Sequence, residues 1–354
     1  MPREGPDDFS VLRVSAFPTE KRNGMGLPAY MLAADDRYST VYRAPAVRHE
    51  PPLAVPGEQV DLRLFDFPIR PLPQYWKASP EMLASSIRRA ATATMFNTRV
   101  LLDGAARKVD LVHIHSPMYV GVAAYAKLRG IPTVLTFHGT DFFRVQGSSL
   151  LRRFLAPIDQ VLCVSDLFIS ELKRLFPKKN IDPVYNGVDS DRFSPSLAPP
   201  EGRLSRIITV GNLSWYKDHR RLIAAFAELA ETYPEWELAI AGDGELRSEL
   251  EQVASDAGLS KRVRFMGTLS HEELAKEVAA SEVFAMSSVT EGLPKALLEA
   301  MASGCACVAT DVGECRSVLG DAGLITPPED TPSIASALDS LLSSAELRRK
   351  LGQR

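Results

Sequence analysis

The chain has 354 residues, which is long for one hydrophobic core and favours two domains of about 150 to 200 residues each. Its hydrophobic content of 45% is ordinary for a globular protein, and no apolar run approaches the roughly 20 residues of a membrane-spanning helix. The net charge of −3 is uneven, because residues 1–200 carry 25 basic and 20 acidic side chains and residues 201–354 carry 16 and 24.

The N-terminus and the cysteines indicate where the protein works. MPREGPDDFSVLRVSAF has no apolar core of signal-peptide length, so we expect a cytoplasmic protein. Cys163, Cys305, Cys307 and Cys315 form no C-x-x-C pair and lie in or beside apolar, strand-like segments. They are therefore predicted to be buried, reduced thiols rather than metal ligands or disulfide partners.

Apolar, β-branched runs alternate with helical patterns along the first half of the chain, as in a parallel sheet covered by helices. One long helical stretch is predicted at residues 79–107. Strands are predicted at residues 11–17, 39–44, 60–67, 110–116, 132–139 and 160–165.

The second half repeats the same alternation with short crossovers. Strands are predicted at residues 206–211, 236–244, 263–268, 283–287 and 305–311. Helices are predicted between them at residues 219–233, 245–258, 270–281 and 295–304. Each of these strands ends in glycine or small polar residues, which let a ligand approach the backbone.

Prolines and turn formers gather at residues 191–202, which we interpret as a linker between domains at residues 1–190 and 203–354. The predicted fold is α/β, with two tandem Rossmann-like, doubly wound parallel-sheet domains that face each other across a cleft. Ligands of such sheets bind at the carboxyl ends of the strands. The D-x-D triplet Asp189 to Asp191 lies in the linker-like segment and is interpreted as a turn rather than a metal site.

The stretch TEGLPKALLEAMASG, residues 290–304, begins with an acid, a glycine and a proline that a packing helix does not need. Glu291 and Gly292 fall in the loop after a predicted strand, whereas Pro294 suits the first helical turn. Glu299 lies on the helix itself. Since a helix start attracts phosphate and carboxylates bind sugar hydroxyls, a nucleoside diphosphate sugar would suit this stretch.

This stretch resembles the Glu-x7-Glu donor-binding motif of the retaining glycosyltransferases of family 4, the group 1 glycosyl transferases with the GT-B fold. Several motifs in the same order extend the resemblance over nearly the whole chain. The other similar segments are FPTEKRNGMGLPAYMLA (residues 17–33), FHGTD (137–141), VYNGVDSDRFSP (184–195), VGNLSWYKDHRRLIAAF (210–226), LAIAGDGELRSELE (238–251), VRFMGTLSHEEL (263–274) and SGCACVATDVGECRSVL (303–319).

The resemblance implies a role for each matching residue of the second domain. Glu291 would hold hydroxyls of the donor sugar, and Glu299 would hold those of the ribose. Lys217 would neutralise the departing diphosphate, with help from the backbone N–H groups of Gly292 and Leu293. The alternatives for these residues are a solvated lysine and structural salt bridges.

In the first domain, the resemblance implies that His138 contacts the sugar near the reacting carbon. Gly24 and Gly26 would let the backbone approach the phosphates. The alternatives are a structural histidine and an ordinary turn. The sequences GDGE, residues 242–245, and NGMG do not complete G-x-G-x-x-G, so a dinucleotide-dependent enzyme is disfavoured.

Three features depart from the family pattern. Gly211 and Asn212 stand where the family commonly has Gly-Arg before the phosphate loop, so the grip on phosphate would be weaker. Ser317 stands four residues after Gly313, where a glutamate is common. The chain also stops before the family's usual final crossover helix, so we expect that helix to be lacking.

The implied activity is sugar transfer from a UDP- or GDP-sugar to an acceptor hydroxyl with retention at the anomeric carbon. Positive groups placed where the leaving diphosphate develops its charge would supply the catalysis, so no metal and no cofactor are expected. The product would be a polysaccharide, a glycolipid or another glycoconjugate. The alternatives are a nucleotide-sugar epimerase and an inactive nucleotide-sugar-binding subunit.

The acceptor is not indicated by any motif. Residues 70–153 hold 12 basic and 4 acidic side chains. The basic residues Arg88, Arg89, Arg99 and Lys108, together with Arg107, allow a lipid-linked acceptor and peripheral contact with an anionic membrane at its cytoplasmic face. No nucleic-acid partner is expected.

Overall fold

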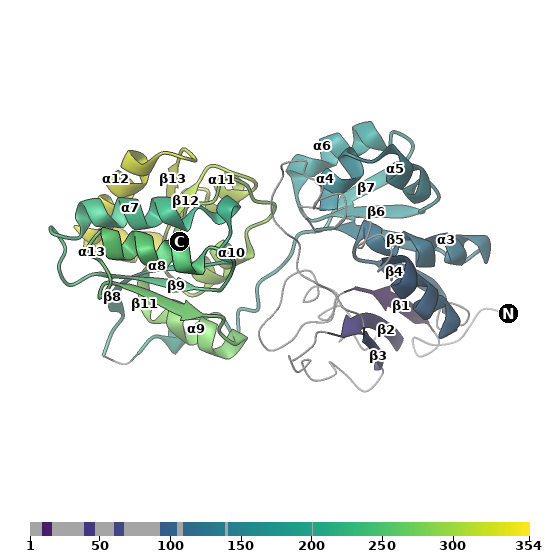
Figure 1. The fold of residues 1–354 in the computed structure, drawn as a ribbon, viewed down its shortest axis with the longest axis horizontal. Helices are drawn as coiled ribbons and strands as arrows, with labels where there is room; N and C mark the ends of the chain where they lie inside the picture. Colours follow the sequence, from purple (N-terminus) through teal and green to yellow (C-terminus); the bar gives the residue numbers. More distant parts are fainter. Residues whose placement is uncertain are drawn as a thin grey trace. The chain divides into compact units, whose positions relative to one another are not determined.

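The chain forms two compact units, Met1–Tyr185 and Asn186–Arg354, each an α/β body with its own sheet (Figure 1). The division falls a few residues before the expected linker. The computed structural model describes residues 9–15, 39–46, 60–66, 93–104, 109–138, 141–199 and 201–354. None of the helices in these ranges combines the length and the apolar character that a membrane-spanning segment requires.

The first unit is built on a seven-stranded parallel sheet in the order β3-β2-β1-β4-β5-β6-β7. Its order reverses between β1 and β4, as in doubly wound folds. All six strands predicted here are present. The strands are β1 (Ser10–Val14), β2 (Ser39–Ala46), β3 (Val60–Asp66), β4 (Leu111–Ile114), β5 (Thr133–Phe137), β6 (Gln160–Cys163) and β7 (Asn180–Pro183).

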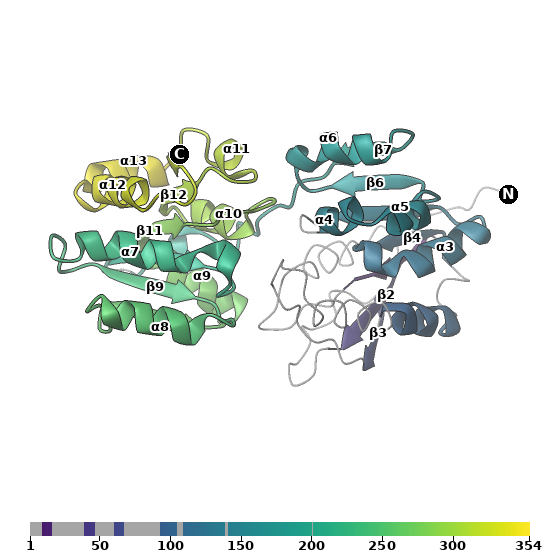
Figure 2. The ribbon, with the colours of Figure 1, turned by 45° about the horizontal axis from the view of Figure 1, so that its top comes forward.

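Helices pack along this sheet, as Figure 2 shows. Val112 and Ile114 of β4 and Leu135 and Phe137 of β5 are at most 1% exposed and form the core of the unit. Of the helical stretch predicted at residues 79–107, the described part is helical over 93–102. The other helices are α3 (Val120–Leu128), α4 (Asp141–Gln146), α5 (Ser149–Leu155) and α6 (Asp166–Leu175), with the 3-10 turn η3 (Pro117–Tyr119).

The strand β7 is not predicted from the sequence. Its four residues, NIDP, include one buried side chain, Ile181, so no periodic pattern marks it. The strand lies at the edge of the sheet, where Pro183 removes no hydrogen bond that an inner strand would need.

The second unit holds a six-stranded parallel sheet in the order β10-β9-β8-β11-β12-β13. The five strands predicted from the sequence are all present, and β13 is additional. The strands are β8 (Leu204–Val210), β9 (Glu237–Ala241), β10 (Val263–Gly267), β11 (Ser281–Met286), β12 (Ala306–Thr310) and β13 (Gly323–Thr326).

This second sheet is buried on both faces. The neighbouring residues Ile207 and Ile208 of β8 point to opposite faces, and each belongs to a separate apolar cluster. The continuous apolar runs of the sequence follow from this double burial. The helices are α7 (His219–Leu229), α8 (Arg247–Asp256), α9 (His271–Ala279), α10 (Lys295–Ala302), α11 (Cys315–Leu319), α12 (Thr331–Leu342) and α13 (Ala345–Gly352), with the 3-10 turns η4 (Pro195–Leu197) and η5 (Trp215–Lys217).

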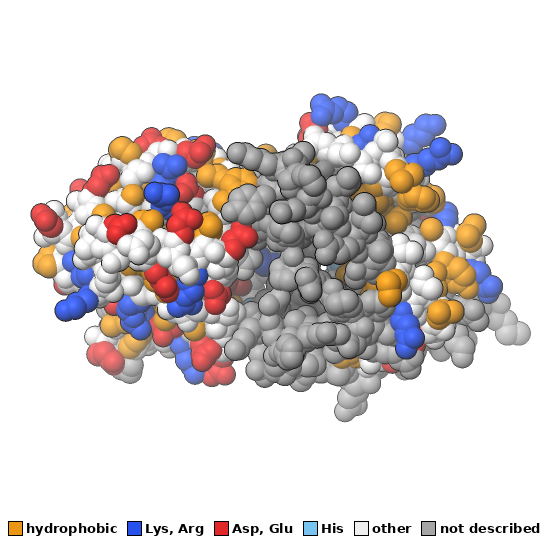
Figure 3. All heavy atoms as spheres, viewed as in Figure 1, with side chains coloured by type: hydrophobic (Ala, Val, Ile, Leu, Met, Phe, Trp, Pro, Cys, Tyr) orange, Lys and Arg blue, Asp and Glu red, His pale blue; other side chains and the backbone are white. Residues whose placement is uncertain are grey.

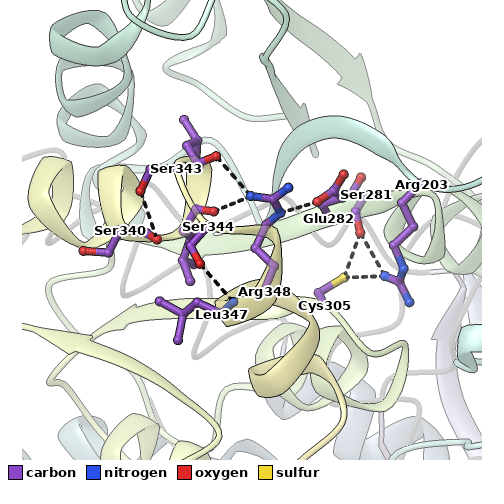
Figure 4. A network of polar contacts seen from close by, with 11 residues as sticks. Arg203, Ser281, Glu282, Cys305, Ser340, Ser343, Ser344, Leu347 and Arg348 are labelled. Atoms are coloured by element: carbon purple, nitrogen blue, oxygen red, sulfur yellow. Dashed lines mark hydrogen bonds and ion pairs between the residues drawn. The ribbon is translucent and has the colours of Figure 1, made fainter.

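The last two helices, α12 and α13, are not identified from the sequence. Helix α12 packs against α7. Figure 4 shows Arg348 of α13 between Glu282 of β11 and the end of α12, where its guanidinium donates to the carbonyl of Leu342 at 3.0 Å. The same guanidinium lies 5.0 Å from the ring centre of Trp236. These contacts fasten α13 to the sheet.

The four cysteines are buried, which confirms the expected burial. The Asp189 segment also forms a turn, because the Asp189 carboxylate accepts a hydrogen bond from the N–H of Arg192 at 3.1 Å. Among the described residues, no group of three or more histidine, cysteine, aspartate or glutamate side chains could hold a metal ion.

Candidate functional site

Two loops of the second unit meet at the carboxyl edge of its sheet. One, residues 211–218, follows β8, and the other, residues 287–294, follows β11. Since β8 and β11 are parallel neighbours, their carboxyl ends lie at the same edge. The sheet topology therefore brings together two segments that are far apart in sequence.

Hydrogen bonds to backbone carbonyls join these two loops. The N–H of Val289 donates to the carbonyl of Tyr216 at 2.8 Å. The hydroxyl of Ser287 lies 3.1 Å from the carbonyl oxygen of Lys217 and 2.9 Å from that of Asp218. The backbone that carries Lys217 is thus fixed against the backbone that leads to Glu291.

The loops present an ion pair between Lys217 and Glu291. Lys217 Nζ lies 2.6 Å from Glu291 Oε1, and the two side chains are 16% and 11% exposed. The hydroxyl of Ser288 donates to the same carboxylate oxygen at 2.7 Å. Burial acts against the ammonium charge, but the Glu291 carboxylate outweighs it and raises the pKa of Lys217 above its ordinary value. Lys217 is therefore a cation at neutral pH.

Glycines make room for this lysine. A Cβ on Gly211 would lie 3.3 Å from Lys217 Cε, so the lysine stem rests directly against Gly211. Gly242, at the end of β9, has a φ of 146°, and a Cβ there would lie 1.9 Å from the carbonyl oxygen of Gly211. A Cβ on Gly244 would lie 2.4 Å from the carbonyl oxygen of Leu213. This packing role of GDGE is not predicted from the sequence.

The loop that holds Gly292 is supported by the segment that follows β12. Gly313 has a φ of 55°, and a Cβ there would lie 2.5 Å from the carbonyl oxygen of Gly292. That carbonyl accepts a hydrogen bond from the N–H of Glu314 at 3.0 Å. The two contacts set the path of the chain from Glu291 through Gly292 to Leu293, which leads into α10.

The prediction for Pro294 is off by one position. Helix α10 begins at Lys295, and Pro294 is its N-cap residue, with a ψ of 93° that is not helical. The restriction that proline places on its own φ still aligns the helix start. Glu299 lies on the helix, as expected, and its carboxyl is poorly solvated. Burial raises the pKa of Glu299 to about 7, although nearby Lys295 acts to lower it.

Asn212, which stands where the family commonly has an arginine, is exposed in the loop after β8. The backbone carbonyl of Asn212 accepts a hydrogen bond from the N–H of Ser214 at 2.9 Å, which shapes the turn ahead of Lys217. The side chain of Ser317, the second departure, donates to the carboxylate of Glu314 at 2.6 Å.

The first unit presents histidines at the carboxyl edge of its own sheet. His138 directly follows β5, while His113 and His115 lie on and just after the neighbouring β4. The rings of His113 and His115 are stacked with centres 4.0 Å apart, and those of His115 and His138 are 5.5 Å apart. The Nδ1 atom of His115 lies 3.3 Å from Nε2 of His138. Only His138 is predicted from the sequence, although the H-x-H spacing at the end of a strand marks the other two.

A buried arginine borders this row of rings. Arg13 of β1 is the cross-strand partner of His113, and its guanidinium lies 2.9 Å from His113 Nδ1. Burial, followed by the positive charge of Arg13, holds the pKa of His113 well below its ordinary value. Burial also lowers the pKa of His115, with His113, His138 and Arg13 contributing. Both rings are therefore neutral at pH 7.

Several predicted residues lie outside the described part of the chain. Gly24 and Gly26 are among them, and so are Arg88, Arg89, Arg107 and Lys108. Arg99 is described and is exposed on the helical segment 93–102. The roles assigned to the two glycines stay predictions.

Two family models match the chain. The model for glycosyl transferases group 1 matches residues 191–354, and that for glycosyltransferase family 4 matches residues 32–192. Between them they span both units.

Curated relatives agree with these matches. The chain is 30% identical over 265 residues to N-acetyl-alpha-D-glucosaminyl L-malate synthase of Bacillus anthracis, covering 70% of this chain and 68% of that protein. It is 30% identical to phosphatidyl-myo-inositol mannosyltransferase of Mycolicibacterium smegmatis, covering 82% and 78%. It is 27% identical to one subunit of the phosphatidylinositol N-acetylglucosaminyltransferase of Arabidopsis thaliana, covering 67% of this chain and 55% of that longer protein.

Solved structures share the fold across both units. Sucrose-phosphate synthase from Thermosynechococcus elongatus superposes with a TM-score of 0.76 at 21% identity, covering 98% of this chain and 92% of that one. Anabaena HepE in complex with UDP and glucose superposes with a TM-score of 0.71 at 18% identity, covering 97% and 92%.

Proposed function

The chain belongs to the group 1 glycosyl transferases of glycosyltransferase family 4, with the GT-B fold, and from this membership we propose that it is a retaining glycosyltransferase. The donor is a nucleoside diphosphate sugar, and the acceptor is a hydroxyl group. The product is a polysaccharide, a glycolipid or another glycoconjugate.

The observation that carries the proposal is the Lys217–Glu291 pair at the carboxyl edge of the second sheet. A cation and a carboxylate side by side, 2.6 Å apart on loops joined by backbone hydrogen bonds, suit the junction between a sugar and the diphosphate attached to it. Lys217 contacts the diphosphate, and Glu291 accepts hydrogen bonds from sugar hydroxyls. Glu299 accepts hydrogen bonds from the ribose.

The proposed chemistry is electrostatic. The bond between the anomeric carbon and the diphosphate oxygen breaks, and negative charge grows on that oxygen. Lys217 and the N–H groups of Gly292 and Leu293 stabilise this charge where it develops, which lowers the barrier without a metal. The acceptor oxygen attacks from the face that the diphosphate leaves and gives its proton to the departing phosphate, so the configuration is retained.

The support for a nucleotide donor comes from the site and from the neighbours. HepE is described in complex with UDP and glucose, and it shares the fold of this chain. We propose UDP or GDP as the nucleotide, with His138 contacting a hydroxyl of the sugar. Gly24 and Gly26 are proposed to approach the phosphates.

A donor screen tests this function. Calorimetry with UDP and GDP identifies the nucleotide, and hydrolysis of the matching panel of nucleotide sugars then measures turnover. We expect one diphosphate to bind and its sugar conjugates to be hydrolysed slowly without an acceptor. Binding without turnover of any sugar would instead favour the inactive binding protein, and a new nucleotide sugar as product would favour an epimerase.

We further propose a lipid-linked acceptor and peripheral membrane contact through the first unit. Helices α3 and α5 pack side by side, and hydrophobic side chains gather over them in Figure 3. Leu128, Leu150 and Phe154 are 87%, 64% and 53% exposed, and Arg129 and Arg153 are exposed beside them. Apolar side chains bordered by arginines suit an anionic lipid surface.

Liposome retention tests the membrane contact. Vesicles with anionic lipid should retain the protein at low salt, and the double variant Leu150→Glu/Phe154→Glu should lose at least three quarters of that retention. Leu167→Glu, on the exposed part of α6, is the matched control and should keep it. Equal retention of both variants would remove the membrane contact from the proposal.

A further inference from the structure

The imidazoles of His113, His115 and His138 form a row in the first unit. The row has hydrogen bonds that a sugar contact by His138 alone would not need. His113 is 6% exposed and His115 is 1% exposed, so neither ring presents a face to solvent. A ring N–H buried without an acceptor is costly, and native proteins rarely contain one. The hydrogen bonds along the row therefore determine which nitrogen of each ring carries its proton.

The arginine fixes the first ring. A guanidinium can only donate, so His113 Nδ1, 2.9 Å from Arg13 Nη1, must accept. The single proton of this neutral ring is then on Nε2, which donates to the hydroxyl of Thr136 at 2.8 Å. Both nitrogens of His113 are thereby satisfied without its neighbours in the row.

The neutral ring of His115 can carry its proton on Nδ1 or on Nε2, and its hydrogen-bond partners determine which. Nδ1 of His115 lies 3.3 Å from His138 Nε2, whereas Nε2 of His115 is buried with no hydrogen-bond partner in the described ranges. A proton on Nε2 would be a buried donor with no acceptor, which native proteins rarely contain. A proton on Nδ1 donates to His138. The neutral ring of His115 is therefore the Nδ1–H tautomer.

We infer that His115 is a positioning residue, which donates from Nδ1 to Nε2 of His138 and so fixes His138 as the tautomer with its proton on Nδ1. A neutral imidazole whose Nε2 accepts can carry its proton only on Nδ1. His138 then has one defined donor and one fixed ring orientation. The role for catalysis rests on the proposed sugar contact of His138, but the tautomer itself does not.

The functional gain is a donor that is ready before the substrate arrives. Without the His115 donor, Nε2 of His138 could carry the proton instead, and this nitrogen would no longer be held as an acceptor. Groups that act on a ligand through another residue in this way commonly cost about tenfold or more in activity when removed. We therefore expect removal of the His115 donor to lower kcat about tenfold or more, with a smaller effect on the donor KM.

Nitrogen-15 NMR of histidine-labelled protein tests the tautomer directly. Two-bond proton–nitrogen spectra at pH 8 distinguish a nitrogen that carries hydrogen from one that does not. We expect His138 and His115 with the proton on Nδ1 and His113 with the proton on Nε2. A wild-type spectrum with the His138 proton on Nε2 would overturn the inference, whether or not the protein transfers sugar.

Three variants separate positioning from packing. His115→Leu fills the space without a donor, and it should leave His138 as a mixture of tautomers with kcat about tenfold lower or more. His115→Asn places an amide N–H near the position of Nδ1, so it should keep the His138 tautomer and restore most of the rate. His113→Asn also removes a ring from the row but still offers Arg13 an acceptor, and it should leave the His138 tautomer unchanged.

The outcomes are distinguishable from failure of the proposed function. If His138→Ala transfers sugar at the wild-type rate, the sugar contact is wrong, while the spectra still decide the tautomer. If His115→Leu does not fold, the wild-type and His115→Asn spectra decide. If His115→Leu folds and keeps a pure Nδ1–H tautomer at His138, the positioning role is wrong.

Discussion

The carboxyl edges of the two sheets carry opposite kinds of chemistry. In the second unit, the edge presents a charged pair, Lys217 and Glu291, on loops held by backbone hydrogen bonds and close-packed glycines. In the first unit, it presents imidazoles kept neutral by burial and by the charge of Arg13. The carboxyl edge of the sheet thus carries charged side chains in the second unit and neutral, oriented hydrogen-bonding groups in the first.

The difference shows how each edge is built. Lys217 depends on backbone geometry, because its loop is shaped by contacts between main chains that admit no side chain at Gly242. The histidine row depends on side-chain hydrogen bonds that begin at Arg13 and Thr136. A substitution that adds volume should therefore disturb the Lys217 loop of the second unit most. A substitution that removes a hydrogen-bond donor should disturb the histidine row of the first unit most.

The largest expected effect is on catalysis at the charged edge. Lys217→Ala should lower kcat about 100- to 1,000-fold, because it removes the cation that is proposed to stabilise the leaving diphosphate. Lys276→Ala is the matched control, since Lys276 pairs with Glu272 on the exposed surface of the same unit. Steady-state hydrolysis of the donor measures both. A rate for Lys217→Ala within about threefold of the wild type would contradict the assigned role.

The next effect is on stability. Gly242→Ala should lower the free energy of unfolding by about 3 kcal/mol, because a Cβ there collides with the Gly211 carbonyl and the backbone conformation favours glycine. Gly258→Ala, at a φ of 73° with nothing within 4 Å, should cost only about 1 kcal/mol from backbone strain. Urea unfolding measures both. Equal losses would show that the close packing beneath Lys217 is unimportant.

A smaller effect concerns pH. Burial raises the pKa of Glu299 to about 7, from 4.5 in the unfolded chain. The folded state therefore holds more protons than the unfolded state between pH 4.5 and 7, so stability falls as the pH rises through this range. The loss is about 2 kcal/mol after allowance for partial solvation. Glu299→Gln should abolish this part of the pH dependence, as urea unfolding at pH 5 and pH 8 would show. An unchanged slope would place the ionisation elsewhere.

Much of the fold is predictable because the strands are buried on both faces. The alternation of apolar runs and helical patterns identifies eleven strands that the structure contains. The edge strand β7 is not predicted from the sequence, because Ile181 is its one buried residue and no periodic pattern marks it. The strand β13 and the helices α12 and α13 follow the last family-like motif, and no motif marks them.

Site residues that belong to a sequence motif are predictable. Residues whose role depends on contacts between distant segments are not. Lys217 and Glu291 are both predicted from the sequence, but their ion pair depends on the adjacency of β8 and β11. Gly242 acts through a contact with another loop, which no local pattern reveals. Arg13 meets His113 because β1 and β4, distant in the sequence, are neighbours in register.

The central claim is that Lys217 contacts the phosphate that leaves with the nucleotide, and nucleotide affinity tests it most directly. Calorimetry would compare the diphosphate that the donor screen selects with its monophosphate, on wild type and Lys217→Ala. Loss of one charge-assisted contact predicts an affinity for the diphosphate about 10- to 100-fold lower, with the monophosphate affinity within about twofold of wild type. Equal losses for both nucleotides, or none for the diphosphate, would contradict the account.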